Sequence, residues 1–350
     1  MKMKYAWKAF LTGLFAAAGM TAAAASPLEE TYTTIPLKLM SAEGTLIFSD
    51  CPEYAGDYGI LYEGTVKKGK GRVYYYHVNQ TGAPARVVVY ARSKKKQDLT
   101  VTRTVRGEAS RDYISTGATL SFREVVNPLQ KAETVTLPQN GRTILFEDDP
   151  KGVKEENLVS GMVEIETEKP VTLGAAILPD GSRKDVEEAL QTALRLPPDT
   201  HEMRGTFASD IYLENKPWDF KKGPAEIVVG KSIPFQQGMD EMSRVKRENT
   251  GDYGITYHIS FHNKGEGKYK LYINPQGGVY MGTFRIGHNE KVLQIFRTDT
   301  AKRGKWFGNN TEEDYMEAGT WEMGRDLFIR FIPAGAAYLP LRFLMVPVKE

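Results

Sequence analysis

The sequence predicts an all-β protein made of two related antiparallel β-sandwich (or jelly-roll-like) domains joined by one short amphipathic helix. Three observations predict this fold class. Short runs rich in Val, Ile, Tyr, Phe and Thr alternate with Gly, Pro, Asn and Asp about every ten residues. The tract GDYGILYEGTV at Gly56 is nearly repeated as GDYGITYHISF at Gly251, 195 residues later. A single segment between the two halves has helical periodicity.

The first 25 residues have the pattern of a secretory signal peptide. Lysines occupy three of the first eight positions, an apolar run covers residues 9–20, and Ala23-Ala24-Ala25 offers small residues for cleavage before Ser26. A membrane anchor is the alternative, but about 12 apolar residues are too few to cross about 30 Å of hydrocarbon. We therefore expect a secreted or extracytoplasmic protein of the periplasm or cell envelope, with no transmembrane segment after cleavage.

Residues 26–180 are expected to form the first sandwich. Its strand candidates include ARVVVYA at Ala85, DLTVTRTV at Asp98, ATLSFREVV at Ala118, GMVEIET at Gly161 and PVTLGAAIL at Pro170. β-Branched and aromatic side chains in such runs suit a pleated, half-buried surface. The connection NQTGAP, after Val78, has the composition of a hairpin turn.

Residues 181–198 are expected to form a helix that connects the sandwiches. Apolar side chains recur there with the spacing of one helix face, at Val186, Ala189, Leu190, Ala193 and Leu194. Ser182 followed by Asp185 resembles a capping box. Pro197-Pro198 ends the helix, because proline lacks the amide donor and restricts the preceding residue.

Residues 199–350 are expected to form the second sandwich, related to the first by duplication. Tyr62 and Tyr257 occupy equivalent places in the two tracts, and the turn KGKG from Lys68 recurs as KGEG from Lys264. The turns are offset by one residue more than the tracts, a difference that a β-bulge can absorb. Each copy is therefore predicted to be a β-hairpin introduced by Gly-Asp-Tyr-Gly.

The charge balance excludes one class of function. Removal of residues 1–25 leaves 43 basic and 44 acidic side chains, a net charge of about −1, which argues against a nucleic-acid binder. Lys67–Arg106 contains eleven Lys or Arg and one acid, whereas Glu147–Glu168 contains eight acids and two lysines. The two segments either neutralise each other or leave a basic face for an anionic envelope polymer. The candidate ligand-binding residues of such a face are Lys94, Lys95, Lys96 and Arg103.

No motif predicts catalysis, a cofactor or a metal site. Cys51 is the only cysteine, which excludes an internal disulfide and a site ligated by several cysteines. The sequence lacks HExxH, GxSxG, a Walker phosphate loop and an EF-hand loop. His258 and His262 would lie about 13 Å apart on a strand, too far to share one ion. Asp57 and Asp252, from the repeated tetrapeptide, are expected to cap turns in separate domains.

Two tryptophans are candidates for ligand contact. Trp218 in ENKPWDFKKGP and Trp306 in KRGKWFGNN lie in polar segments flanked by glycine or proline, which are typical of loops. A loop indole can stack on a sugar or a partner protein, or it can fold back over the core. Both arrangements are consistent with the sequence.

Several segments resemble a group of uncharacterised secreted bacterial proteins: ILYEGTV with RVYYYHVN, HEMRGTF at His201, GDYGITY, NPQGGVYMG at Asn274 and IPAGAAYLPLRFLMVP at Ile332. Some members of this group are classified through an accompanying copper amine oxidase N-terminal-like stalk domain. This chain lacks such a stalk, so the resemblance implies no copper. It implies an extracytoplasmic location and a two-part β body, and no reaction.

Two functions are consistent with these observations. The first is a non-catalytic cell-envelope or extracellular protein that binds a polysaccharide or another surface component, such as an envelope protein. The second is a glycan-active or other secreted hydrolase whose catalytic groups converge only in three dimensions. A cleft that is lined by aromatic rings and contains two carboxylates would favour the second function.

Overall fold

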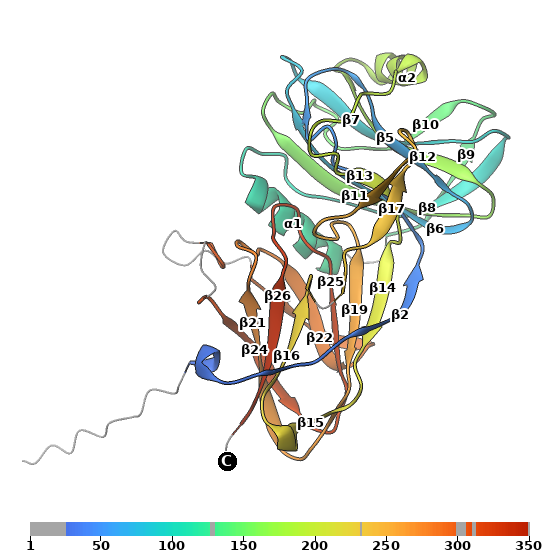
Figure 1. Cartoon of the computed structure of the whole chain (residues 1–350). Helices are drawn as coiled ribbons and strands as arrows, with labels where there is room; N and C mark the ends of the chain where they lie inside the picture. The colour runs from blue at the N-terminus through green and yellow to red at the C-terminus, as the bar shows by residue number, and fades with distance from the viewer. Residues whose placement is uncertain (1–25, 127–129, 232, 299–305, 310–312, 349–350) are drawn as a thin grey trace, which may run out of the picture.

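The computed structural model describes residues 26–126, 130–231, 233–298, 306–309 and 313–348. Two β-sandwiches lie end to end, with helix α1 (Tyr113–Val126) between them and helix α2 (Arg183–Thr192) at the far end of the first (Figure 1). The predicted all-β class with two related sandwiches is confirmed. The expected signal segment, residues 1–25, lies outside the described residues.

The first body consists of two facing sheets. One has the order β10-β7-β12-β5 and contains β5 (Gly59–Val66), β7 (Ala85–Arg92), β10 (Arg142–Glu147) and β12 (Val171–Pro179). The other has the order β18-β17-β13-β3-β6-β11-β8-β9, with β4 (Tyr54–Ala55) beside β6. Its other strands are β3 (Thr45–Ser49), β6 (Gly69–Asn79), β8 (Gln97–Arg106), β9 (Glu133–Leu137), β11 (Leu158–Thr167), β13 (Arg204–Phe207), β17 (Gln237–Asp240) and β18 (Val245–Glu248). Aliphatic side chains of both sheets form the core between them.

The second body also has two facing sheets. The order β2-β14-β19-β25-β22-β23 contains β2 (Lys38–Glu43), β14 (Asp210–Glu214), β19 (Thr256–Phe261), β22 (Thr283–Asn289), β23 (Val292–Arg297) and β25 (Leu327–Phe331). The order β1-β16-β26-β21-β24 contains β1 (Thr33–Thr34), β16 (Ala225–Val229), β21 (Lys268–Pro275), β24 (Met316–Glu322) and β26 (Leu341–Pro347). Short additions are β15 (Trp218–Asp219) with β20 (Asn263–Lys264), and the 3-10 turns η1 (Pro27–Glu29) and η2 (Phe220–Lys222).

The two bodies share a topology of six strands. Strands β5, β6, β7, β10, β11 and β12 correspond in order to β19, β21, β22, β23, β24 and β25, and both sets make the same antiparallel pairs. One row of cross-strand partners in the first body is Tyr62, Ala175, Val89 and Phe146. The corresponding row in the second body is Tyr257, Phe331, Phe284 and Phe296. Tyr62 to Tyr257 and Val89 to Phe284 are both separated by 195 residues, the offset of the repeated motif, so duplication explains the repeat.

The predicted hairpin after Gly-Asp-Tyr-Gly is wrong in both copies. Strands β5 and β6 belong to opposite sheets of the first body, and β19 and β21 belong to opposite sheets of the second. The turn after Val66 therefore carries the chain from one layer to the other, because each strand already finds antiparallel partners within its own sheet. A sequence pattern of strand, turn and strand cannot distinguish this connection from a hairpin.

The predicted domain boundaries need correction, because strands cross them in both directions. Strand β2, from the expected first domain, pairs with β14 of the second body. Strands β13, β17 and β18, from the expected second domain, extend the first body's sheet through the pairing of β13 with β3. The chain therefore passes between the bodies several times, and neither range, 26–180 or 199–350, is a separate unit.

The helix predicted within 181–198 is confirmed as α2, with both hydrogen bonds of the Ser182–Asp185 capping box. Its place in the fold differs from the prediction. Val186 and Leu190 pack on the outer face of the first body, against a cluster that includes Ile60 and Tyr90, and the helix lies far from the second body (Figure 1). The helix covers the outer face of the sheet that contains β5 and β7 and does not connect two domains.

The strand predicted at Ala118 is wrong, because this segment is part of helix α1. Its buried side chains include Thr116, Leu120 and Glu124, a four-residue spacing that places them on one helix face. The Asp112 carboxylate accepts the N–H of Ser115 and caps the helix start. The segment's Thr, Phe and Val content favours a strand, but the segment forms a helix that is buried between the two bodies. No helix in the described part of the chain is long and apolar enough to cross a membrane.

Candidate functional site

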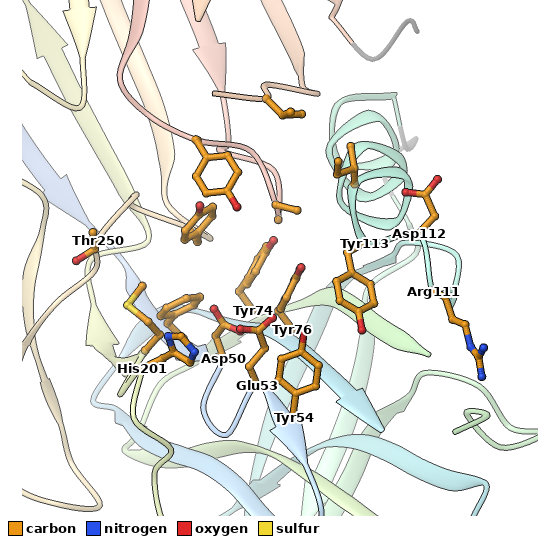
Figure 2. A pocket seen from close by; sticks show the side chains of 18 residues that line it. Asp50, Glu53, Tyr54, Tyr74, Tyr76, Arg111, Asp112, Tyr113, His201 and Thr250 are labelled. Atoms are coloured by element: carbon orange, nitrogen blue, oxygen red, sulfur yellow. The ribbon is translucent and has the colours of Figure 1, made fainter. Parts of the chain in front are cut away.

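A pocket of about 860 Å³ opens where the two bodies meet, and we name it the junction pocket. Its walls come from the β3–β4 turn, β6, the start of α1, the segment before β13 and three loops of the second body. Six tyrosines line it: Tyr54, Tyr74, Tyr76, Tyr113, Tyr253 and Tyr338. Figure 2 shows four of them around the carboxyl groups of Asp50 and Glu53.

Strand alternation explains the tyrosines of β6. Side chains on a strand point alternately to opposite faces. Tyr75 packs into the core of the first body, whereas Tyr74 and Tyr76 belong to the core shared with the second body. The run Tyr74-Tyr75-Tyr76 thus supplies one ring to a sandwich interior and two to the junction pocket.

Two carboxyl groups enter the pocket from the turn after β3. Asp50 and Glu53 lie next to each other in Figure 2, close to Tyr76 and His201. Asp50 Oδ1 is shielded from solvent and has no hydrogen-bond partner among the described groups. Burial raises the pKa of Asp50 well above its ordinary value, and the nearby Glu53 and Asp199 raise it further. Burial also raises the pKa of Glu53, with His201 opposing the shift and Asp199 adding to it.

Buried polar groups hold this turn in place. His77 lies within hydrogen-bond distance of Ser49 Oγ through Nε2, at 2.9 Å, and of the Pro52 carbonyl through Nδ1, at 2.8 Å. Burial lowers the pKa of His77 to about 4, so the ring is neutral at pH 7. Both Ser49 and His77 are inaccessible to solvent. This Ser–His pair therefore positions the turn that carries Asp50 and is closed to any substrate.

Asp199 fixes the same turn from the other side. Its carboxylate accepts the backbone N–H of Glu53 at 2.8 Å and of His201 at 3.0 Å, and the Cys51 thiol at 3.2 Å. Burial raises the pKa of the Asp199 carboxyl, but these donors outweigh burial and lower it overall. Burial also raises the pKa of the Cys51 thiol to about 12, which keeps it protonated and unreactive.

The other charged side chains of the pocket wall have partners elsewhere. Arg111 forms an ion pair with Glu156 at 2.5 Å and points away from the carboxyl pair in Figure 2. Asp112 caps helix α1. Among the described residues of the wall, the carboxyl groups of Asp50 and Glu53 and the imidazole of His201 therefore have no ion pair and remain for a ligand.

This arrangement suits binding of a polar molecule with flat faces. Tyrosine rings offer apolar surfaces with a hydroxyl at the edge, and the carboxyl groups offer hydrogen-bond donors or acceptors according to their protonation. Among the described residues, no group of three or more His, Cys, Asp or Glu side chains is placed to hold a metal ion.

The structure places the two candidate tryptophans away from this pocket. Trp218 lies in β15, at the far end of the second body (Figure 1), where it packs against the core and donates to the Gly223 carbonyl at 3.3 Å. The Lys222 ammonium lies 5.6 Å from its ring centre. Trp306 is half-buried beside the buried Phe307. Neither tryptophan lines the junction pocket.

The basic candidates divide into two groups. Lys94, Lys95 and Lys96 are exposed and line a second pocket of about 550 Å³ together with Lys169 and Arg92, which we name the lysine cleft. Arg92 lies 3.6 Å from Glu63, whereas the four lysines make no ion pair with any described carboxylate. The lysine cleft thus keeps an uncompensated positive charge, contributed by two turns that are distant in sequence.

Arg103 does not belong to this surface. Its guanidinium is mostly buried and donates to Glu124 of helix α1 at 3.3 Å. Arg72 and Arg106 likewise pair with the acidic segment, through Glu164 at 2.7 Å and Asp148 at 2.9 Å. Local neutralisation therefore accounts for most of the basic segment, and the exceptions are the exposed Lys67 and the lysines of the lysine cleft.

Sequence reasoning missed the junction pocket. Asp50 and Glu53 lie in FSDCPEY, a segment with no catalytic or binding motif, and the tyrosines come from five separate stretches of the chain. The sequence feature that could have indicated the pocket is the run of three tyrosines in RVYYYHVN. Two of these large rings lie on the same strand face, and they need an apolar surface to pack against besides the core of their own sandwich.

Comparison with known proteins gives no identity. No family model matches the chain, and no curated protein matches it. One solved structure found is that of Fet3p, described as a multicopper oxidase that functions in iron import, with 8% identity and a TM-score of 0.14. The alignment covers 76% of this chain and 51% of that one, so the chain spans about half its length. At this TM-score the similarity supports neither a shared fold nor a shared activity.

Proposed function

We propose that this protein binds a glycan in the junction pocket. The observation that carries the proposal is that six tyrosines line one pocket of about 860 Å³ together with Asp50 and Glu53. Sugars present apolar faces that stack on aromatic rings and hydroxyls that bond to carboxyl groups. The pocket has both elements, and its volume lies within the range of small-ligand sites, about 300–1,000 Å³.

The position of the pocket also supports this proposal. Its walls come from both bodies, which share one hydrophobic core across the junction. Hydrogen bonds of His77 and Asp199 fix the turn that carries the two carboxyl groups, so these groups are positioned before a ligand binds. A preformed site loses less conformational entropy on binding.

Substitution of exposed pocket tyrosines tests the proposal without disturbing the core. Tyr54 and Tyr338 are 43% and 52% exposed. We expect Tyr54→Ala and Tyr338→Ala to weaken binding about five- to tenfold each, from the loss of about 1 kcal/mol of ring contact. The probes are a microarray of neutral, amino and acidic oligosaccharides, followed by calorimetry. Tyr315→Ala, at a tyrosine 40% exposed and outside the pocket, is the matched control. Absence of binding to every probe, or equal binding by all three variants, would overturn the proposal.

A second candidate function is glycan hydrolysis at the same site. It is favoured by one observation, namely that burial raises the pKa values of two neighbouring carboxyl groups, Asp50 and Glu53. Such a pair can supply a protonated acid and an ionised base to one glycosidic bond. Mass spectrometry of the bound oligosaccharides after incubation distinguishes the two functions. Shortened products that disappear in Asp50→Asn indicate hydrolysis, and intact probes indicate binding alone.

We further propose export to the cell envelope and contact with an anionic polymer there. The basic and apolar pattern of residues 1–25 supports export, and the uncompensated lysine cleft supports the contact. A mature chain that begins at Ser26, retained on isolated envelope at low salt and released at high salt, is the expected result. An unprocessed chain, or no retention at low salt, would contradict it.

A further inference from the structure

The charges that face the junction pocket are unbalanced. Asp50 and Glu53 form no ion pair with any described basic group, and Asp50 Oδ1 is shielded and unpartnered. His201, on the pocket wall near Glu53, is the one imidazole among the described lining residues. Arg111, the guanidinium on the wall, is paired with Glu156 instead. A shielded carboxyl group without a donor is costly, so it marks a place for a ligand atom.

The rings around these carboxyl groups also favour a positive charge. The face of an aromatic ring is electronegative and attracts a cation placed within about 6 Å of its centre. Tyr74 and Tyr76 lie beside the carboxyl pair in Figure 2. Tyr74 is only 1% exposed, and its hydroxyl lies near Ser160 and Gly335.

We propose that the junction pocket recognises the ammonium group of an amino sugar, so that its ligand is a glycan with free amines. This inference rests on the proposed glycan-binding function and names its ligand class. The ammonium group lies between Asp50 and Glu53 with tyrosine faces around it, and the remaining sugar rings stack on the exposed tyrosines at the mouth. An acidic glycan is disfavoured at this site, because it would bring negative charge beside two acidic groups that have no basic partner for an ion pair among the described residues.

The test compares two oligosaccharides that share one sugar backbone and differ in the group on each nitrogen, a neutral acetamide in one and a free amine in the other. Chitotetraose carries four N-acetyl groups, and its fully de-N-acetylated form carries four free amines on the same backbone. Calorimetry with the mature chain is done at pH 6, where a sugar amine holds its proton. We expect the free-amine form to bind at least tenfold more tightly than the acetylated form.

Two pocket variants and one control test whether Asp50 and Glu53 cause the preference for the free-amine form. Asp50→Asn and Glu53→Gln keep the shape of each side chain and remove its ability to ionise beside an ammonium group. We expect each to weaken binding of the free-amine form about tenfold and to change binding of chitotetraose less than twofold. Glu166→Gln removes an exposed carboxylate on β11, outside the pocket, and is expected to change neither affinity. The rigid setting of the turn makes these isosteric changes compatible with folding, which circular dichroism verifies.

The outcomes separate this inference from the proposed function. Binding of chitotetraose with equal or greater affinity than its free-amine form overturns the inference and leaves glycan binding standing. Wild-type affinity of both charge variants for the free-amine form also overturns it. Failure of both tetrasaccharides and of the whole oligosaccharide panel to bind overturns the proposed function itself.

Discussion

At the scale of single residues, the repeated tetrapeptide shows how one sequence acquires two environments. Asp57 is exposed, whereas Asp252 is 2% exposed and has a positive φ of 49°. Asp252 accepts the backbone N–H of Gln236 at 2.8 Å and the hydroxyl of Tyr257 at 2.5 Å. Burial raises the pKa of Asp252 to about 6, because these two donors only partly replace water. Asp252 therefore forms buried hydrogen bonds inside the second copy, whereas Asp57 lies in an exposed turn.

Asp252 should make folding stability fall as the pH rises. Its pKa is about 6 in the folded protein and 3.8 ordinarily, so its contribution is fully present below pH 3.8 and lost through pH 6. The loss amounts to at most about 3 kcal/mol. Asp252→Asn keeps the bond from the Gln236 N–H at its amide oxygen and can replace the other by donating its amide N–H to the Tyr257 oxygen. Asn also tolerates the positive φ. We expect this variant to gain stability relative to the wild type between pH 4 and pH 7, measured by urea unfolding.

Asp57→Asn is the matched control for this measurement. It makes the same change in the exposed copy of the tetrapeptide, and we expect its pH profile to follow that of the wild type. Glu248 is the acidic group that adds to the shift at Asp252. A wild-type profile for Asp252→Asn would show that the carboxyl ionises in the folded protein as freely as in the unfolded chain.

At the scale of elements, helix α1 is the part that binds the two bodies to each other. Glu124, on its buried face, accepts two hydrogen bonds from Arg330 of β25 and one from Arg103 of β8. Burial raises the pKa of Glu124, but Arg330 and Arg103 outweigh burial and lower it to about 2. The helix thus places an ionised carboxylate between one strand of each body. It lies within the insertion between β7 and β10 that the second body lacks.

Gly117 allows this helix to approach the second body closely. A Cβ built on Gly117 would lie 1.9 Å from the backbone oxygen of Gly335, so no side chain fits there without a backbone shift. We expect Gly117→Ala to lower the free energy of unfolding by about 1–3 kcal/mol through overpacking. Equilibrium urea unfolding measures the loss.

The control for this prediction is Gly56→Ala. Gly56 is exposed, and the nearest atom to its added Cβ is 4.0 Å away. We expect this variant to change stability by less than about 0.5 kcal/mol. If Gly117→Ala behaves like Gly56→Ala, the contact with Gly335 does not fix the helix against the second body.

At the scale of the whole molecule, the two bodies form one folding unit. The side chain of Arg72, on β6, donates to the backbone oxygens of Ser209 and Gly254 at 2.8 and 2.9 Å and pairs with Glu164. This guanidinium is 1% exposed. Together with the exchanged strands β2 and β13, it makes the junction an interior rather than a flexible interface.

Cleavage between the bodies should therefore leave them associated. Leu194 is 80% exposed, so a protease can cut near the start of the segment from Arg195 to Arg204. We expect the two fragments to elute together in native size exclusion and to separate only in denaturant, because β2 and β13 each lie in the sheet of the other body. Uncut protein is the reference. Two folded fragments that separate without denaturant would contradict the single folding unit.

The sequence by itself determined the β class, helix α2 with its cap, and the duplication, because alternation, capping and repetition are local signals. It could not assign each strand to a layer. The sequence after Gly56 predicts a hairpin, but its two strands, β5 and β6, lie in different sheets. The segment ATLSFREVV at Ala118 has the composition of a strand, but it forms a helix that is buried between the bodies.

Only the tertiary structure decided where a ligand could bind. Asp50 and Tyr338 are 288 residues apart in the chain, and they line one pocket because the two bodies meet end to end. Alternation in Tyr74-Tyr75-Tyr76 indicates that both faces of β6 are covered, but not that one face is covered by the other sandwich. The alternation that predicts a strand depends on residues two positions apart in the sequence. The pocket depends on which surfaces of the folded bodies pack against each other, and this packing is determined by the whole chain.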